Sequence, residues 1–158
     1  MTGAGLNHNT IVLNIGRELS AELKKRPCRA VASGMKVSIQ SANAGTYPGL
    51  LAFCGAPDFQ DERQDLLLNP CPIIEVLSKS TEAYDRGDKF AMDRLIPSLR
   101  EYLLVSQYRV QAERYTRGAD GRWPLSEFNR SEDRIPLASV DCELALDEVY
   151  DKVEFVQD

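Results

Sequence analysis

The chain has 158 residues and a mass of 17.7 kDa, the size of one domain with a sizeable core. Hydrophobic residues make up 43% and charged residues 27%, as in a water-soluble globular protein, and no apolar run approaches the roughly 20 residues that cross a bilayer. The net charge of −5 and the pI near 5.0 exclude the broad basic surface of a non-specific nucleic-acid binder, but they leave a local basic patch open.

The first half of the chain predicts one helix followed by strands. Residues 9–26 place apolar side chains at helical spacing with charged side chains on the other face, and Pro27 ends the pattern. The runs CRAVAS, MKVSI and YPGLLAFC between Cys28 and Cys54 predict three strands. The polar residues 55–71 contain two prolines and predict a surface loop.

The second half predicts a strand, a helix and further strands. Residues 72–77, PIIEVL, have the composition of a buried strand, and a helix follows from about residue 80 to 95 with an interruption at Gly87. Strands are also predicted over 100–107, 108–117 and 121–128, and a short helix over 144–152. This order predicts a single α/β (α+β) domain over residues 1–158, in which helices flank a mixed sheet.

The four cysteines give a first indication of the compartment. Cys28, Cys54, Cys71 and Cys142 lie far apart and form no CxxC pair, so we interpret them as reduced core thiols, with a disulfide or a metal role as the alternative. The opening residues MTGAGLNHNT lack the basic and apolar regions of a secretory signal. Both observations predict a cytoplasmic protein.

The candidate chemistry centres on Glu75, a carboxylate inside a run that otherwise favours burial. A buried acid needs a charged partner, hydrogen bonds or a metal ion. The sequence contains no glycine-rich phosphate loop, no GxSxG and no HExxH, and His8 is its one histidine. We therefore interpret His8 as a helix-start or packing residue rather than a catalytic one.

The unit EVLSKSTEAYDRGDKF followed by PSLREYLLVSQ resembles the Uma-two family of restriction-endonuclease-like proteins, in the PD-(D/E)XK nuclease superfamily. The likeness continues upstream through NPCPIIEV, YPGLLAF and NHNTIVLNI, and downstream through CELALDEVYDKV, so it covers nearly the whole chain. It implies a restriction-endonuclease-like fold and Mg²⁺-dependent hydrolysis of a DNA phosphodiester.

The resemblance also implies the site. Glu75 matches a catalytic acid that holds the metal, and the Val76 carbonyl would be a further metal ligand. A typical member of the superfamily has lysine where this chain has Leu77, and Lys89 on the following helix matches the lysine of the Uma-two pattern. From spacing alone, a structural ion pair that joins the strand to the helix is the favoured interpretation of Glu75 and Lys89.

The sequence departs from the family at two places that bear on activity. Gly49 stands where the family carries the aspartate of a Pro-Asp pair, so we expect Mg²⁺ binding to be weak or absent. The family's N-terminal hairpin is also expected to be missing before Met1. The alternative function is therefore a catalytically degenerate DNA-binding or protein-interaction module. Expected partners are DNA and a second copy of the chain, paired through an edge strand over 108–117, with no membrane.

Overall fold

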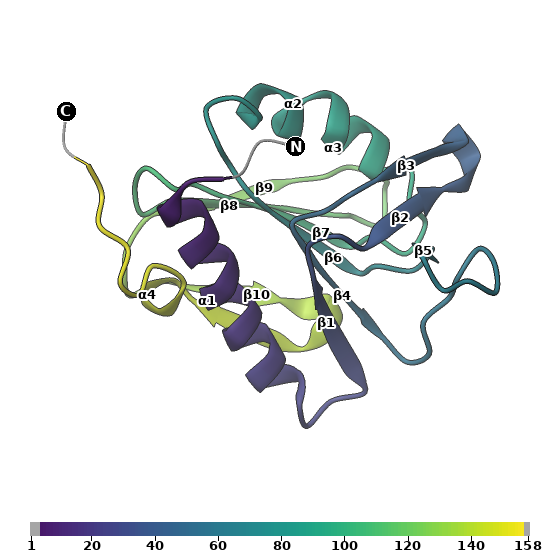
Figure 1. Ribbon diagram of the computed structural model, residues 1–158, viewed down its shortest axis with the longest axis horizontal. Coiled ribbons are helices and arrows are strands. Elements are labelled where there is room, and N and C mark those ends of the chain that lie inside the picture. Colours follow the sequence, from purple (N-terminus) through teal and green to yellow (C-terminus); the bar gives the residue numbers. More distant parts are fainter. Residues whose placement is uncertain (1–3, 157–158) are drawn as a thin grey trace.

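A six-stranded mixed sheet in the order β1-β4-β6-β7-β8-β9 forms the centre of the computed structural model, which describes residues 4–156 (Figure 1). The parallel pair of this sheet is β6–β7, and its other neighbours pair antiparallel. The strands are β1 (Cys28–Ala32), β4 (Leu50–Cys54), β6 (Pro72–Val76), β7 (Glu101–Val105), β8 (Ala112–Thr116) and β9 (Leu125–Phe128).

Helices and two smaller sheets cover the central sheet. Figure 1 shows α2 and α3 on one side, and α1, α4 and the β10–β11 hairpin on the other. The remaining elements are α1 (Leu6–Leu23), β2 (Lys36–Ile39), η1 (Gln40–Ala42), β3 (Ala44–Thr46), β5 (Leu66–Leu67), α2 (Glu82–Arg86), α3 (Asp88–Asp93), β10 (Arg134–Leu137), η2 (Ala138–Val140), β11 (Cys142–Ala145) and α4 (Leu146–Val149). The second sheet has the order β3-β2-β5. The predicted mixed sheet flanked by helices is confirmed.

Each face of the central sheet has its own core. Successive side chains of a strand point to opposite faces, so Ile74 and Val76 of β6 pack with α1, β11 and α4. Ile73 and Leu77 point the other way and pack with Phe90 of α3. The same alternation places Glu75 on the α3 side, beneath the helix pair that connects β6 to β7.

Several predicted elements need correction. The helix predicted over 144–152 is wrong in its first part, because Leu144 pairs with Ile135 in the β10–β11 hairpin, where both side chains are fully buried. The predicted edge strand 108–117 is also wrong: β8 lies between β7 and β9, with both sides paired. That strand therefore offers no free edge for the expected dimer. The 55–71 loop contains the short strand β5.

The interpretation of the cysteines as four reduced thiols is wrong for two of them. Cys28 and Cys54 are direct partners in the β1–β4 register and form a disulfide, whereas Cys71 and Cys142 are free. Spacing in the sequence gave no sign of this bond, because the antiparallel register brings the two residues together. The thiol argument for a cytoplasmic protein is removed with it.

Reduction of the Cys28–Cys54 bond should lower the free energy of unfolding by about 3 kcal/mol, because the bond closes a loop whose ends are 26 residues apart. Urea unfolding with and without dithiothreitol measures the difference. The double variant Cys28→Ser/Cys54→Ser is the control and should unfold identically in both buffers. A wild-type midpoint that ignores dithiothreitol, despite a thiol assay that shows complete reduction, would contradict the prediction.

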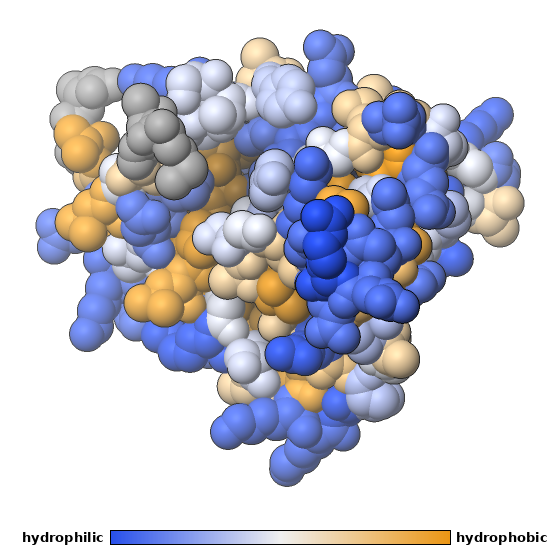
Figure 2. Space-filling view, turned by 45° about the vertical axis from the view of Figure 1, so that its right-hand side comes forward, coloured by the Kyte–Doolittle hydropathy of each residue, from blue (hydrophilic) through white to orange (hydrophobic). Residues whose placement is uncertain are grey.

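The surface is mainly hydrophilic, with apolar side chains interspersed on the face that Figure 2 shows. The most exposed large apolar side chains include Leu6 and Leu13 of α1 and Val156 near the C-terminal end. Among the described residues, no helix has the length and apolar character that a membrane span requires.

Candidate functional site

The candidate site lies where β6 ends beneath α3. Glu75 is the fourth residue of β6, and its side chain faces the helix pair because its neighbours Ile74 and Val76 fill the opposite core. Lys89 is the second residue of α3 and points back to the sheet. The strand is fully buried along its length. The two charged residues therefore meet in the interior and not on the surface.

Glu75 and Lys89 form a buried ion pair in which both side chains are fully engaged. The Lys89 Nζ lies 2.9 Å from Glu75 Oε2 and donates a second hydrogen bond of 3.1 Å to the carbonyl of Tyr47. The other carboxylate oxygen, Oε1, accepts a 3.1 Å hydrogen bond from the amide of Gly49. Only 6% of Glu75 and 8% of Lys89 is exposed. The structure thus brings together Glu75, Lys89 and position 49.

Gly49 approaches β6 too closely for an unadjusted side chain. A Cβ at this residue would lie 3.1 Å from the carbonyl oxygen of Ile74, tighter than an ordinary contact. The space next to Glu75 on this side is therefore filled by backbone. An aspartate at position 49 would require the Ile74 carbonyl to shift by a few tenths of an ångström.

Two more acids surround the Lys89 ammonium. Asp85 lies one helical turn before Lys89, with its Oδ1 4.0 Å from Nζ, and Asp93 lies one turn after it. Asp93 is completely buried, and the Thr46 side chain lies near enough to lower its pKa, although neither carboxylate oxygen accepts a hydrogen bond of ordinary geometry from the described part of the chain. The sequence favoured a surface helix-cap role for Asp85 over that of a compensating metal ligand, and it indicated no role for Asp93. Their i, i+4 spacing from Lys89 was the signal that would have placed them on its side of the helix.

Burial controls the ionisation of these acids. It raises the pKa of Glu75 to about 7, and the Lys89 ammonium only partly opposes this effect. Burial likewise raises the pKa of Asp93 to about 7, again against Lys89, while Glu75 and Asp85 add repulsion. The pKa of Asp85 is raised as well, for the same primary reason. Three buried carboxyl groups therefore share one ammonium group, which leaves an excess of negative charge when all are ionised.

His8 also borders the site, although the sequence predicted only a helix-start or packing role. It occupies the first turn of α1, and its imidazole lies near the Val76 backbone and the Asp85 carboxylate. Burial lowers its pKa below the ordinary value, so the ring favours the neutral form. Its Nδ1 has no hydrogen-bond partner among residues 4–156.

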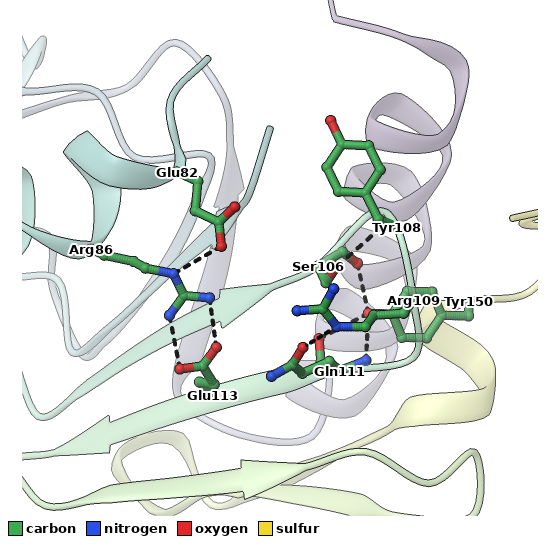
Figure 3. Close-up of polar contacts among 8 residues, drawn as sticks. All are labelled: Glu82, Arg86, Ser106, Tyr108, Arg109, Gln111, Glu113 and Tyr150. Carbon is green, nitrogen blue, oxygen red and sulfur yellow. Dashed lines mark hydrogen bonds and ion pairs between the residues drawn. The ribbon is translucent and has the colours of Figure 1, made fainter. Parts of the chain in front are cut away.

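A second ion pair fastens the helix pair to the sheet. Figure 3 shows Arg86 of α2 with its guanidinium against the Glu113 carboxylate of β8, at 2.8 and 2.6 Å, and against Glu82 at 3.0 Å. This bidentate contact joins α2 to the strand two positions from β6. It holds the helix that carries Asp85 in a fixed position above the sheet.

The loop from β7 to β8 lies beside the same end of β6. Because β6 and β7 are parallel, both end at one edge of the sheet, and the Gln107 side chain donates a 2.7 Å hydrogen bond to the Leu77 carbonyl. Figure 3 shows the Tyr150 hydroxyl in contact with Ser106 and Gln111, with distances of 2.7 Å to the Ser106 carbonyl and 3.0 Å to the Gln111 carbonyl. The edge of the sheet next to Glu75 is therefore well supported.

The residues at this site supply the smallest set of carboxylates that usually holds a divalent cation. Mg²⁺ is usually held by one or two carboxylates, with water and substrate phosphate in the other positions. Glu75 supplies one carboxylate, and the hydrogen-bond-free oxygens of Asp93 lie in the same buried cluster. No group of three or more histidine, cysteine or acidic side chains within residues 4–156 is arranged to hold a metal ion by itself. Further ligands would come from backbone, solvent or substrate.

The chain is similar to a family model and to two proteins of Synechocystis sp.. The family model Uma2, described as "Putative restriction endonuclease", matches residues 1–147. The protein sll1609 of Synechocystis sp., itself uncharacterized, is 35% identical over 81% of this chain and 72% of its own length. The protein slr1290 of the same organism, also uncharacterized, is 33% identical over 98% of this chain and 80% of its own length.

A solved structure supports the fold. It is described as a "putative nuclease belonging to DUF820 from Anabaena variabilis" and superposes with a TM-score of 0.78, over 95% of this chain and 83% of that one. The sequence identity is 14%, so this likeness concerns the fold, and the predicted restriction-endonuclease-like architecture is confirmed. With the match of the family model over residues 1–147 and the two relatives above 30% identity, the chain belongs to the Uma2 family.

Proposed function

We propose that this protein is a divalent-metal-dependent endonuclease that hydrolyses phosphodiester bonds in DNA at the Glu75–Lys89 cluster. Membership of the Uma2 family and the nuclease description of the structural neighbour support the reaction class. The observation that carries the proposal is the buried contact of 2.9 Å between Lys89 Nζ and Glu75 Oε2 beside position 49. DNA is the proposed substrate.

The residues would divide the chemistry as follows. Glu75, with the Val76 carbonyl, would hold Mg²⁺, which when bound polarises a phosphoryl oxygen and lowers the pKa of a coordinated water molecule. The Lys89 ammonium would leave its present contact with Glu75 and stabilise the negative charge that develops on the phosphate. Tyr47 is suited to orient this ammonium, because its carbonyl already accepts a hydrogen bond from Nζ.

Cleavage of supercoiled plasmid DNA tests the proposal. We expect nicking in the presence of Mg²⁺ or Mn²⁺, none in EDTA, and a loss of roughly 10²- to 10³-fold in rate for Lys89→Met. Lys79→Met is the matched control, because Lys79 is an exposed lysine just beyond β6, and it should keep most of the activity. A folded wild-type protein that nicks with neither metal, or that nicks equally in EDTA, would contradict the proposal.

Gly49 favours a second candidate, a DNA-binding module that has lost cleavage. The residue has no side chain, and backbone fills the space beside Glu75 where an acidic ligand was expected. A protein of this kind would bind DNA with or without metal and leave the plasmid intact. Fluorescence anisotropy with a labelled duplex, run in parallel with the nicking assay, separates the two candidates.

A further inference from the structure

Asp93 is the most unusual polar group in the interior. None of its surface is exposed, and neither carboxylate oxygen has a hydrogen-bond partner in the described part of the chain. Burial of a polar group without such a partner costs on the order of 1–3 kcal/mol, and more for a charged group. By comparison, Glu75 uses both of its oxygens and Glu113 is held by Arg86. Within residues 4–156, the Thr46 side chain and the Lys89 ammonium lower the pKa of Asp93, but neither makes a hydrogen bond of ordinary geometry to its carboxylate.

The buried side chains around Asp93 carry an excess of negative charge when they are ionised. Glu75, Asp85 and Asp93 are all buried, and Lys89 is the cation that faces all three. When the acids are ionised, the cluster carries two more negative than positive charges, which is the charge of one divalent cation. The Tyr102 hydroxyl, also beside these acids, donates to the Asp85 carbonyl and adds no positive charge.

Asp93 and Gly49 belong to different segments that border Glu75. Gly49 reaches Glu75 from the segment before β4, whereas Asp93 comes from the end of α3, four residues after Lys89. A helix places residues i and i+4 on one face, so Lys89 and Asp93 both point toward the end of β6. Asp93 can therefore contribute to a metal site beside Glu75 from the helix, on the same face as Lys89.

We infer that Asp93 is the second carboxylate ligand of a divalent-cation site shared with Glu75, and that it replaces the acidic side chain that Gly49 lacks. The inference rests on the proposed function for the presence of the metal. Two carboxylates are within the usual number for Mg²⁺, and the remaining positions are left to water and phosphate. The hydrogen-bond-free oxygens of Asp93 are then ligand atoms.

Titration of the purified chain with MnCl₂ in a calorimeter, without DNA, tests this inference. Asp93→Asn should weaken Mn²⁺ binding at least about tenfold, and Glu75→Gln should do the same. Asp88→Asn is the matched control, since Asp88 is an exposed aspartate at the other end of α3, and it should bind as the wild type does. Gly49→Asp in the Asp93→Asn background should recover part of the binding, because residue 49 also contacts Glu75.

The outcomes separate this inference from the proposed function. Wild-type binding that Glu75→Gln weakens and Asp93→Asn leaves unchanged would overturn the role of Asp93 and leave the endonuclease proposal standing. Binding that depends on Asp93, in a protein that never nicks DNA, would support the ligand assignment and contradict the endonuclease. A wild type that binds no Mn²⁺ would overturn both. Thermal unfolding of each variant without metal shows that the chain is folded.

Discussion

Replacement of Glu75 by glutamine should abolish plasmid nicking and leave the chain about as stable as the wild type at pH 7.5. Glutamine has nearly the same shape and can still accept a hydrogen bond from the Gly49 amide. The loss of a metal-binding carboxylate should reduce the rate by at least about 10³-fold, which corresponds to roughly 4 kcal/mol of transition-state stabilisation. The small effect on stability follows from the number of acids around Lys89.

The effect on stability distinguishes a functional cluster from a structural ion pair. Removal of one partner from an isolated buried pair costs about 3–5 kcal/mol, because the other charge is left uncompensated. Lys89, however, still has Asp85 at 4.0 Å and Asp93 nearby. Glu75→Gln reduces the excess of buried negative charge, so we expect a change of less than about 1.5 kcal/mol in the free energy of unfolding.

Glu113→Gln is the matched control for Glu75→Gln. Glu113 is also a buried glutamate of the central sheet, but within residues 4–156 its bidentate partner Arg86 pairs with one further acid, the half-exposed Glu82 (Figure 3). We expect this variant to lose about 2 kcal/mol of stability and to bind Mn²⁺ as the wild type does. Urea unfolding measures the stability, calorimetry with MnCl₂ measures the binding, and the nicking assay shows whether activity is kept. A Glu75→Gln variant that loses as much stability as Glu113→Gln and keeps its activity would identify Glu75–Lys89 as a structural pair.

The contact between Glu75 and Lys89 was predictable because it depends on short-range features. A strand alternates its side chains between two faces, and the short helical connection to the next parallel strand must cover one of them. Glu75 lies on the covered face, and Lys89 follows only 14 residues later. The proximity of Gly49 was likewise expected from the family pattern, since β4 is the neighbour of β6. The chemical roles of these residues stay predictions.

The other features of the site depend on distant segments that no spacing reveals. The Cys28–Cys54 bond follows from the register of β1 and β4. His8 reaches the site because α1 packs across the sheet, although it is more than 60 residues from Val76 in the sequence. The helix that contains Asp93 was predicted, but the burial of Asp93 was not, because a carboxylate at the end of a short polar helix is expected to be exposed. Only the packing beneath α3 shows that it is completely buried.

Without metal, the free energy of unfolding should fall as the pH rises from about 5 to 8. Burial raises the pKa of Glu75 and of Asp93 to about 7, above the ordinary values of 4.5 and 3.8, so between these limits the folded chain holds protons that the unfolded chain releases. The stabilising contribution of these two carboxyl groups is therefore fully present below their pKa values in the unfolded chain. It is lost as the pH rises through their pKa values in the folded chain. The expected loss is roughly 2.5 kcal/mol for each group, on the order of 5 kcal/mol together.

Asp93→Asn should remove much of this slope, because asparagine does not titrate and Glu75 then loses one repulsive neighbour. The neighbouring His8 acts in the opposite sense, since burial lowers its pKa and its contribution is lost as the pH falls. Its half-buried position keeps that contribution small. Urea unfolding at pH 5, 6, 7 and 8 in EDTA measures the slope.

Addition of MnCl₂ should stabilise the wild type most at pH 8, where both acids are ionised, because a ligand that binds only the folded state adds to its stability. A wild type whose stability rises from pH 5 to 8 in EDTA would show that these carboxyl groups are compensated by something other than a proton or a metal ion.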